Sequence, residues 1–285
     1  MIDDRIEKYR RYKAQEESKI EQDFLEGTKD ENIGVYREMF SAKTGIEGQD
    51  GGVVTTLLVK GFEEGIFDSA IVVRRMEGYS AEAVVATNIG EVLAAKGTKY
   101  LRVNVTQKLR ELISQGKKRV AIVCTPCEVK AVRKIQQTLK NDCEITIISL
   151  FCFEAFNNVR LKKEITSRLG IDLDKAEKTQ IRQGEFITFV DGKEYSCRVK
   201  DLDQATEKSC HYCDDFTGQF ADISVGSVGS QKGYSTVIVR SKVGEKLIKN
   251  LYAAKEGVNK EEIVRLAKLK STRAKKNFAA LNNMK

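Results

Sequence analysis

The chain has 285 residues, of which 41% are hydrophobic and 32% are charged, a composition typical of one or two globular domains. This excludes disordered and fibrous proteins, and no run reaches the ~18 apolar residues of a membrane span. Seven cysteines without an apolar signal peptide argue against a secreted disulfide framework. We therefore expect a cytoplasmic protein with reduced thiols and no membrane span.

The N-terminal segment, residues 1–33, is rich in charged side chains and is predicted to form a helical extension. From Tyr36 onward, buried-strand patterns alternate with helix patterns. The predicted strands are Tyr36–Ala42, Ala70–Val73, Ala83–Ala86, Val120–Val123 and Ile145–Leu150. Five helices are predicted: one over residues 53–65, one that ends at Gly97, one that begins near Val105, one over Glu128–Leu139 and one that ends near Gly170. This alternation predicts an α/β fold with a mixed, mostly parallel sheet and flanking helices.

The second half of the chain has a different pattern. Phe186–Val190 and Glu194–Val199 flank the dipeptide Asp191-Gly192, which predicts a β-hairpin with a type I′ turn. Ala221–Val225 is predicted to be a further strand. We divide the chain into the extension 1–33, a main domain 34–241 with a sub-boundary near 170–180, and a tail 242–285.

The positive charge is concentrated in the tail. The formal net charge is +8, and residues 242–285 hold 12 basic and 4 acidic residues. Such a tail could bind phosphates, but Ile263, Leu266 and Leu269 recur among the basic residues at helical spacing. We expect a basic helix that is solvated or docks a partner, and no nucleic-acid binding.

The cysteines predict a metal or cluster site. Cys127 and Cys152 each follow a predicted strand, and such residues meet at the carboxyl edge of a parallel sheet. Cys210 and Cys213 form a C-x-x-C pair that can fold over this edge, and Pro126, the single proline, fixes the backbone beside Cys127. Four thiolates at this place fit zinc or a [4Fe–4S] cluster equally well. The remaining cysteines, expected to be buried core residues, are Cys124, Cys143 and Cys197.

Three glycine-containing loops are candidates for phosphate binding. The first, which ends in Gly51-Gly52, lies between a predicted strand and a helix, but it lacks the G-x-G-x-x-G fingerprint. Free amides at that helix start suit a pyrophosphate, although from the residues alone an ordinary loop, helix cap or turn is the favoured interpretation of all three segments. The other two loops are Gly97-Thr98-Lys99 and Gly226-Ser227-Val228-Gly229.

Several motifs in one order resemble the beta subunit family of coenzyme F420-reducing hydrogenases and the related dehydrogenases. The resemblance covers about residues 34–285 and leaves out the charged N-terminal stretch. The motifs are Gln49–Thr55, Lys96–Tyr100, Thr125–Cys127, Phe151–Glu154, Cys210–Cys213, Phe220–Gly229 and Gly233–Ser241.

The resemblance implies an FAD-containing electron-transfer subunit with one [4Fe–4S] cluster and coenzyme F420 as its substrate. It favours iron–sulfur over zinc at Cys127, Cys152, Cys210 and Cys213. On the same basis, the residues assigned to FAD are Gly51, Gly52, Gly97, Thr98, Lys99, Gly226, Ser227 and Gly229.

The implied activity is hydride exchange between FAD and coenzyme F420, with electrons relayed through the cluster to a partner. A flavin handles both hydrides and single electrons, so it belongs between the coenzyme and the cluster. No general acid or base is required, so no catalytic side chain is assigned and His211 is interpreted as a loop residue near the cluster. An F420-reducing [NiFe] hydrogenase is the favoured partner. The same module could oxidise reduced F420 for a dehydrogenase, a heterodisulfide reductase or a sulfite reductase, and a zinc-stabilised interaction or nucleic-acid module is a more remote alternative.

Overall fold

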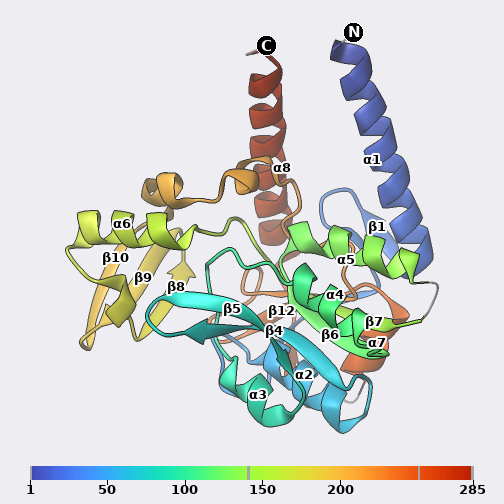
Figure 1. The fold of residues 1–285 in the computed structure, drawn as a ribbon, viewed down its shortest axis with the longest axis horizontal. Coiled ribbons are helices and arrows are strands. Elements are labelled where there is room, and N and C mark those ends of the chain that lie inside the picture. The colour runs from blue at the N-terminus through green and yellow to red at the C-terminus, as the bar shows by residue number, and fades with distance from the viewer. Residues whose placement is uncertain (1, 140–141, 250, 284–285) are drawn as a thin grey trace.

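A mixed β-sheet organises the molecule (Figure 1). The computed structural model describes residues 2–139, 142–249 and 251–283. In their order across the sheet, the strands are β13 (Ala254–Glu256), β3 (Glu38–Lys43), β12 (Ser235–Val239), β11 (Ile223–Gly226), β7 (Glu144–Leu150), β6 (Arg119–Cys124), β4 (Ser69–Met76) and β5 (Ser80–Ala86). The central strands β11, β7, β6 and β4 pair in parallel, and the outer strands pair antiparallel. The predicted mixed α/β architecture is confirmed.

The strand predicted at Ala83–Ala86 is present as β5, and no helix separates it from β4. β5 instead pairs antiparallel with β4, with Ala70 opposite Ala86 and Met76 opposite Ser80. Gly78 in the connecting turn has φ 64°, a conformation that glycine adopts without steric cost. This hairpin forms one edge of the sheet, with β5 as the outermost strand.

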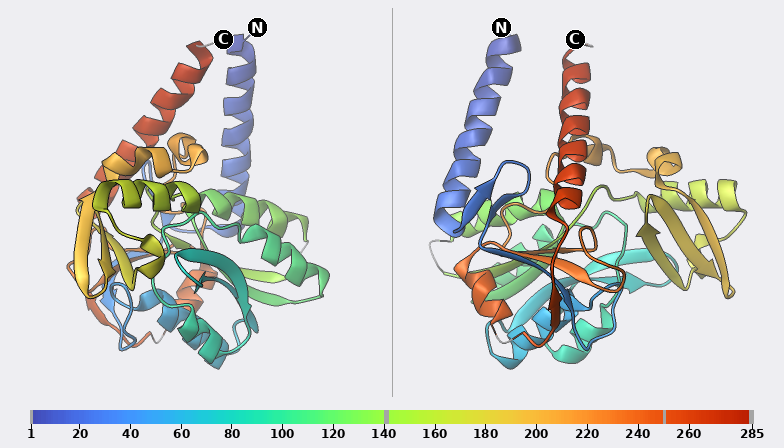
Figure 2. Two further views of the ribbon diagram at one scale, coloured as in Figure 1. Left: turned by 60° about the vertical axis from the view of Figure 1, so that its left-hand side comes forward. Right: turned by 180° about the vertical axis from the view of Figure 1, so that it is seen from behind.

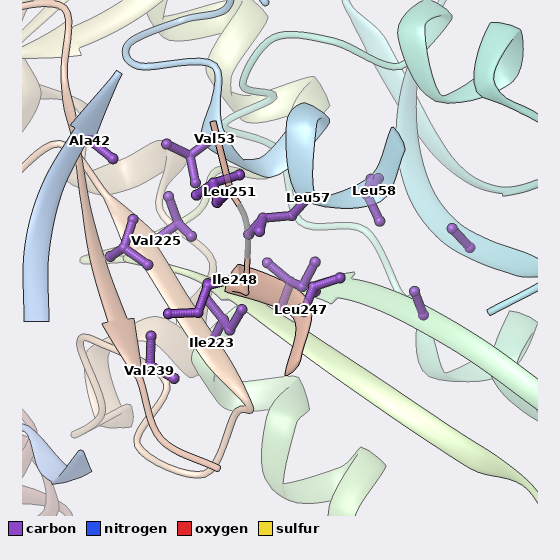
Figure 3. Close-up of a cluster of buried hydrophobic side chains, with 14 of the residues drawn as sticks. Ala42, Val53, Leu57, Leu58, Ile223, Val225, Val239, Leu247, Ile248 and Leu251 are labelled. Atoms are coloured by element: carbon purple, nitrogen blue, oxygen red, sulfur yellow. The ribbon is translucent and has the colours of Figure 1, made fainter. Parts of the chain in front are cut away.

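Helices cover both faces of the sheet because its strands alternate their side chains. Ala70 and Val72 pack on one face, and Ile71 and Val73 pack on the other. The first face is covered by α2 (Val53–Glu63), α3 (Ile89–Ala94) and α7 (Lys242–Ile248), and Figure 3 shows this core. The second face is covered by α4 (Thr106–Ser114), α5 (Pro126–Thr138) and the inner end of α1 (Ile2–Phe24). Each fully buried Leu, Ile or Val contributes roughly 1.5–3 kcal/mol to this packing.

A buried ion pair fixes the helix that carries Cys127. Nη2 of Arg133 on α5 lies 2.9 Å from Oδ1 of Asp222, and both side chains are almost fully buried. The second Asp222 oxygen accepts the Ile147 N–H at 2.7 Å, so the pair ties α5 to β7 and to the start of β11. Removing one partner of such a pair costs about 3–5 kcal/mol.

A smaller antiparallel sheet lies beside the main one. It consists of β8 (Lys178–Arg182), β9 (Glu185–Val190) and β10 (Lys193–Arg198), and α6 (Asn158–Leu169) packs on it through Leu161 and Ile165. Positive φ angles at Asp191 (50°) and Gly192 (70°) confirm the type I′ hairpin. β8 was not predicted, because that strand contains a single aliphatic residue. The short 3-10 helices are η1 (Leu173–Lys175), η2 (Val199–Ala205) and η3 (Lys208–Tyr212).

The helices at the two ends of the chain, α1 and α8 (Lys260–Asn283), project from the body in the same direction (Figures 1 and 2). A short β-hairpin follows α1, formed by β1 (Thr28–Asp30) and β2 (Gly34–Tyr36). Among the residues that the structure describes, no helix is both long enough and apolar enough to span a bilayer. Part of the predicted tail joins the main sheet, because β13 pairs with β3. The division at residues 33 and 241 stays a prediction.

The tail is helical over most of its described length, as predicted, but the aliphatic residues noted in the sequence do not all lie on its buried face. Ile263 is buried, whereas Leu269 has 53% of its surface exposed. A step of six residues turns an α-helix by about 240°, so these two side chains point in different directions. The residues buried along α8 are Ile263, Ala267, Lys270 and Ala274.

Candidate functional site

The carboxyl edge of the central strands carries the cysteines predicted to bind a cluster. Cys127 lies in the first turn of α5, directly after β6, and Cys152 follows the end of β7. β6 and β7 are parallel and in register, with Cys124 opposite Ser149, so both strands end at the same edge. Cys210 lies in η3, and Cys213 is the residue that ends it.

Hydrogen bonds hold the C-x-x-C segment against the Cys152 segment. The Cys152 N–H donates to the Phe216 carbonyl at 2.9 Å, and the Glu207 N–H donates to the Ala155 carbonyl at 2.9 Å. The Ala155 N–H lies 3.5 Å from the Sγ atom of Cys210. These contacts on both sides of the pair bring Cys210 and Cys213 to the sheet edge.

The electrostatics of the thiols also show that these cysteines are neighbours. Burial raises the pKa of the Cys152 thiol to about 12, and the Cys127, Cys210 and Cys213 thiols add to this effect. Burial likewise raises the pKa of the Cys127 and Cys210 thiols. Soft metals bind the thiolate form, so a bound group must supply positive charge and displace these protons.

The donor set consists of sulfur atoms, which suit zinc or iron–sulfur groups. A zinc ion needs its sulfur ligands at about 2.3 Å from one centre. Within the described parts of the chain, no group of three or more His, Cys, Asp and Glu side chains is arranged to hold a single metal ion. The choice between zinc and an iron–sulfur cluster at these cysteines stays a prediction.

The other cysteines lie elsewhere. Cys124 and Cys143 are buried in the core beneath α4 and α5, and Cys197 on β10 packs against the core of the small sheet. His211 lies within η3, where its carbonyl accepts the Asn277 amide at 2.9 Å and its Nδ1 lies 3.9 Å from Asp203. It is thus a loop residue beside the cysteines.

Two cations flank the cysteine set, and neither was predicted from the sequence. Nη1 of Arg102 lies 3.5 Å from Sγ of Cys127 and 3.4 Å from Oε2 of Glu128. Lys270 on α8 donates from Nζ to the Cys152 carbonyl at 2.5 Å. Lys270 could have been found in the sequence, because it lies seven residues after Ile263 and therefore on the same helix face.

A cavity of about 140 Å³ lies next to the cysteine edge. Gln49 from the first glycine loop and Gly97, Thr98 and Lys99 from the second contribute to its wall. The remaining lining residues come from the β4–β5 hairpin, the 96–101 loop and the segment leading into β8, and they are Arg75, Tyr79, Ser80, Lys96, Leu101, Glu177, Lys178 and Thr179. The structure thus brings the first two predicted loops together around one space.

Gly51 and Gly52 do not line the cavity, and the backbone around them itself requires glycine. A Cβ atom on Gly51 would lie 2.2 Å from the Ala42 carbonyl oxygen. Gly52 has φ 71°, and a Cβ atom there would lie 1.8 Å from the Ile46 oxygen. Gly52 precedes α2, whose start has no side-chain cap, so its first amides remain available to an anion.

Lys99 presents a positive charge in the cavity wall. Its Nζ donates to the carbonyls of Ala95, Lys96 and Gly97 at 2.5, 3.0 and 2.8 Å, beyond the end of α3. Burial lowers the pKa of Lys99 to about 8, and the nearby charge of Arg75 contributes. An anion in the cavity would favour the protonated form of this lysine.

The third predicted loop lies elsewhere. A Cβ atom on Gly226 would lie 2.2 Å from the Phe151 ring, and the Gly229 carbonyl accepts the Asn259 N–H at 2.8 Å. Gly226, Ser227 and Gly229 therefore pack toward Phe151 and the start of α8, and none of them lines the cavity. Close packing accounts for the two glycines, and FAD contacts for this loop remain a prediction.

The cavity and the cysteine set are adjacent along the backbone. Leu101 lines the cavity, and the next residue, Arg102, contacts Cys127. Buried Phe156 holds the backbone of Leu101 and Arg102 in place. Its carbonyl accepts the Arg102 N–H at 3.0 Å, and its N–H donates to the Tyr100 carbonyl at 2.8 Å. A group in the cavity and a group on the cysteines would therefore be close neighbours.

Comparison with known proteins gives the class. Residues 39–110 match the family "Coenzyme F420 hydrogenase/dehydrogenase, beta subunit N-term", and residues 117–263 match its C-terminal counterpart. The chain therefore belongs to the coenzyme F420 hydrogenase/dehydrogenase beta subunit family, which consists of F420 oxidoreductase subunits. The resemblance stated from the motifs is confirmed.

Individual relatives include hydrogenase subunits and a reductase. The chain is 38% identical over 257 residues to the coenzyme F420-dependent sulfite reductase of Methanocaldococcus jannaschii, a match that covers 85% of this chain and 40% of that protein. It is 30% identical over 275 residues to the coenzyme F420 hydrogenase subunit beta of Methanothermobacter thermautotrophicus, covering 88% of this chain and 97% of that subunit. The chain thus spans about two fifths of the reductase but nearly all of the hydrogenase subunit.

A solved structure also supports the assignment. A chain of the F420-reducing [NiFe] hydrogenase complex from Methanosarcina barkeri matches with a TM-score of 0.83 and 28% sequence identity. The match covers 88% of this chain and 94% of that chain. The fold described above is therefore that of a subunit known to occur in a multi-subunit complex.

Proposed function

We propose that the chain is a flavo-iron-sulfur subunit that exchanges a hydride with coenzyme F420 and passes single electrons to or from a partner subunit. One observation carries this proposal: Leu101 and Arg102, which are consecutive, contact the cavity and the cysteine set. When bound, FAD would supply hydride exchange with the coenzyme and a [4Fe–4S] cluster would supply one-electron transfer.

The residues of the chain act by binding and orienting these groups. Cys127, Cys152, Cys210 and Cys213 would hold the cluster, and Pro126 at the start of α5 fixes the backbone beside Cys127. Thr98 and Lys99, with the uncapped start of α2, would bind the FAD pyrophosphate. The thiols need a reducing environment, so we place the protein in the cytoplasm.

An F420-reducing hydrogenase is the favoured partner because the chain spans 97% of a hydrogenase beta subunit. The second candidate is an input module that oxidises reduced F420 for a sulfite reductase. The 38% identity to the sulfite reductase favours it, although this chain spans only 40% of that protein. Isolation of the native complex and identification of its other subunits would decide between the two.

The biochemical proposal is tested by anaerobic stopped-flow measurements on the isolated chain loaded with FAD and iron–sulfur. Reduced coenzyme F420 is expected to bleach the flavin absorbance rapidly, followed by slower cluster reduction. NADH and NADPH serve as matched controls and should react far more slowly. Bleaching by a nicotinamide but not by the deazaflavin would overturn the proposal, and a colourless protein containing zinc would favour the interaction-module alternative.

A further inference from the structure

Lys270 occupies a position in α8 at which a lysine is unexpected. It belongs to the buried face of the helix, between Ala267 and Ala274, and only 1% of its surface is exposed. Burying an ammonium group is costly unless it is paired with negative charge or hydrogen-bonded. This lysine therefore points to an anion in its surroundings.

The surroundings of Lys270 are the proposed cluster ligands. Its Nζ donates to the Cys152 carbonyl at 2.5 Å. Burial acts to lower its pKa, but the Cys152 and Cys213 sulfurs and the Asp215 carboxylate raise the pKa above its ordinary value. The Asp215 carboxylate accepts the N–H groups of Thr217, Gly218 and Gln219 at 3.1, 2.8 and 3.0 Å. Its charge is therefore shared with these backbone amides.

The neighbouring cation on the same helix is arranged differently. Arg273 lies 2.6 Å from Oε2 of Glu154, so a carboxylate partly neutralises it, and it also donates to the Cys210 carbonyl at 3.3 Å. Lys270 forms no such ion pair among the residues that the structure describes. Its charge thus remains directed at the sulfur ligands.

We propose that Lys270 sets the reduction potential of the cluster by placing a buried positive charge against Cys152 and Cys213. This inference rests on the proposed function, because it requires a cluster on these cysteines. Reduction adds one electron to the cluster, supplied by the flavin or the partner, and no bond is made or broken. The reduced form carries one more negative charge, so a nearby cation stabilises it and raises the potential.

The expected effect is large enough to measure. A unit charge a few ångströms from the ligands, at an effective dielectric constant of about 20, changes the equilibrium between oxidised and reduced cluster by about tenfold or more. For one electron, tenfold corresponds to 59 mV. Lys270→Met removes the charge and keeps the stem, whereas Lys270→Arg keeps the charge.

The test is an anaerobic redox titration of the loaded chain followed by electron paramagnetic resonance, together with iron and sulfide analysis. The reduction potential is expected to fall by at least about 59 mV in Lys270→Met, which is a tenfold change in the equilibrium between oxidised and reduced cluster. In Lys270→Arg it should stay close to the wild-type value. Lys268→Met, on the exposed side of the same helix, is the matched control and should leave the potential unchanged. A full cluster at wild-type potential in Lys270→Met overturns the inference.

Additional outcomes separate this inference from the proposed function. A wild-type protein that binds no iron–sulfur would end the proposed function itself. If Lys270→Met loses the cluster, Lys270→Gln decides, because its amide can still donate to the Cys152 carbonyl without carrying charge. A lowered potential in Lys270→Gln supports the inference, and loss of the cluster from both neutral variants overturns it in favour of a structural role.

Discussion

The cysteine set and the cavity are built from different regions of the fold. The cysteines lie at the ends of the central parallel strands and on η3, where hydrogen bonds and burial fix them. The cavity lies between an edge hairpin, the 96–101 loop and the segment leading into the small sheet. The first region follows a general rule of parallel sheets, whereas the second depends on how irregular segments pack. Mutations should therefore affect the two regions independently.

Replacement of a cluster ligand is expected to have the largest effect. Cys152→Ser should remove nearly all iron, because a hydroxyl is a poor substitute for a soft thiolate ligand. Cys143→Ser, a buried core cysteine that precedes β7 and so lies at the opposite end of that strand from Cys152, should keep its iron. Iron analysis and the visible spectrum measure both variants. Loss of iron from Cys124→Ser with retention in Cys127→Ser would show that the ligands are wrongly assigned.

Gly52→Ala tests whether the first glycine loop is required by the fold itself. The added Cβ would lie 1.8 Å from a carbonyl oxygen at a residue with φ 71°. We expect a loss of about 3 kcal/mol in the free energy of unfolding, even without flavin. Gly97→Ala, which has φ 87° but open space around it, should cost only about 1 kcal/mol. Equal melting temperatures for the two variants would contradict this distinction.

Lys99→Glu tests the cavity alone. Reversing the charge beside the proposed pyrophosphate should weaken FAD binding by at least about tenfold, while iron content stays normal. Lys99→Met should fall between this variant and wild type. Lys246→Glu, at an exposed position on α7 that does not line the cavity, is the control. Normal FAD occupancy in Lys99→Glu would show that the cavity does not bind the pyrophosphate.

The smallest effect concerns pH. Lys99 has a pKa of about 8 in the protein without ligand, and its protonated form attracts a phosphate. FAD affinity should therefore be highest below pH 8 and decline as the pH rises through this value, because binding must then also protonate the lysine. Lys99→Arg, which stays charged, should remove most of this dependence. Equilibrium titrations of FAD between pH 7 and pH 9.5 would measure it; the same slope in both proteins would assign it to another group.

The difference between the cysteine set and the cavity also explains how much of each could be predicted from the sequence. Cys127 and Cys152 could be placed together because strands of continuous apolar residues precede both and parallel strands end at one edge. The cavity could not be assembled in this way. Its wall includes Arg75 on an edge hairpin and Lys178 in the first position of β8, a strand with little hydrophobic pattern. Gly226 and Gly229 were assigned to FAD from the resemblance, yet tight packing against Phe151 and α8 already accounts for them.

The contact between α8 and the cysteines also has a consequence for biosynthesis. Lys270, Arg273 and Asn277 from the C-terminal helix hold the backbone carbonyls of Cys152, Cys210 and His211. These residues follow the central strands and η3 in the chain, so they are synthesised after all four cysteines. The cysteine edge is therefore incomplete until α8 docks on it, and a cluster bound there would be enclosed only after that docking.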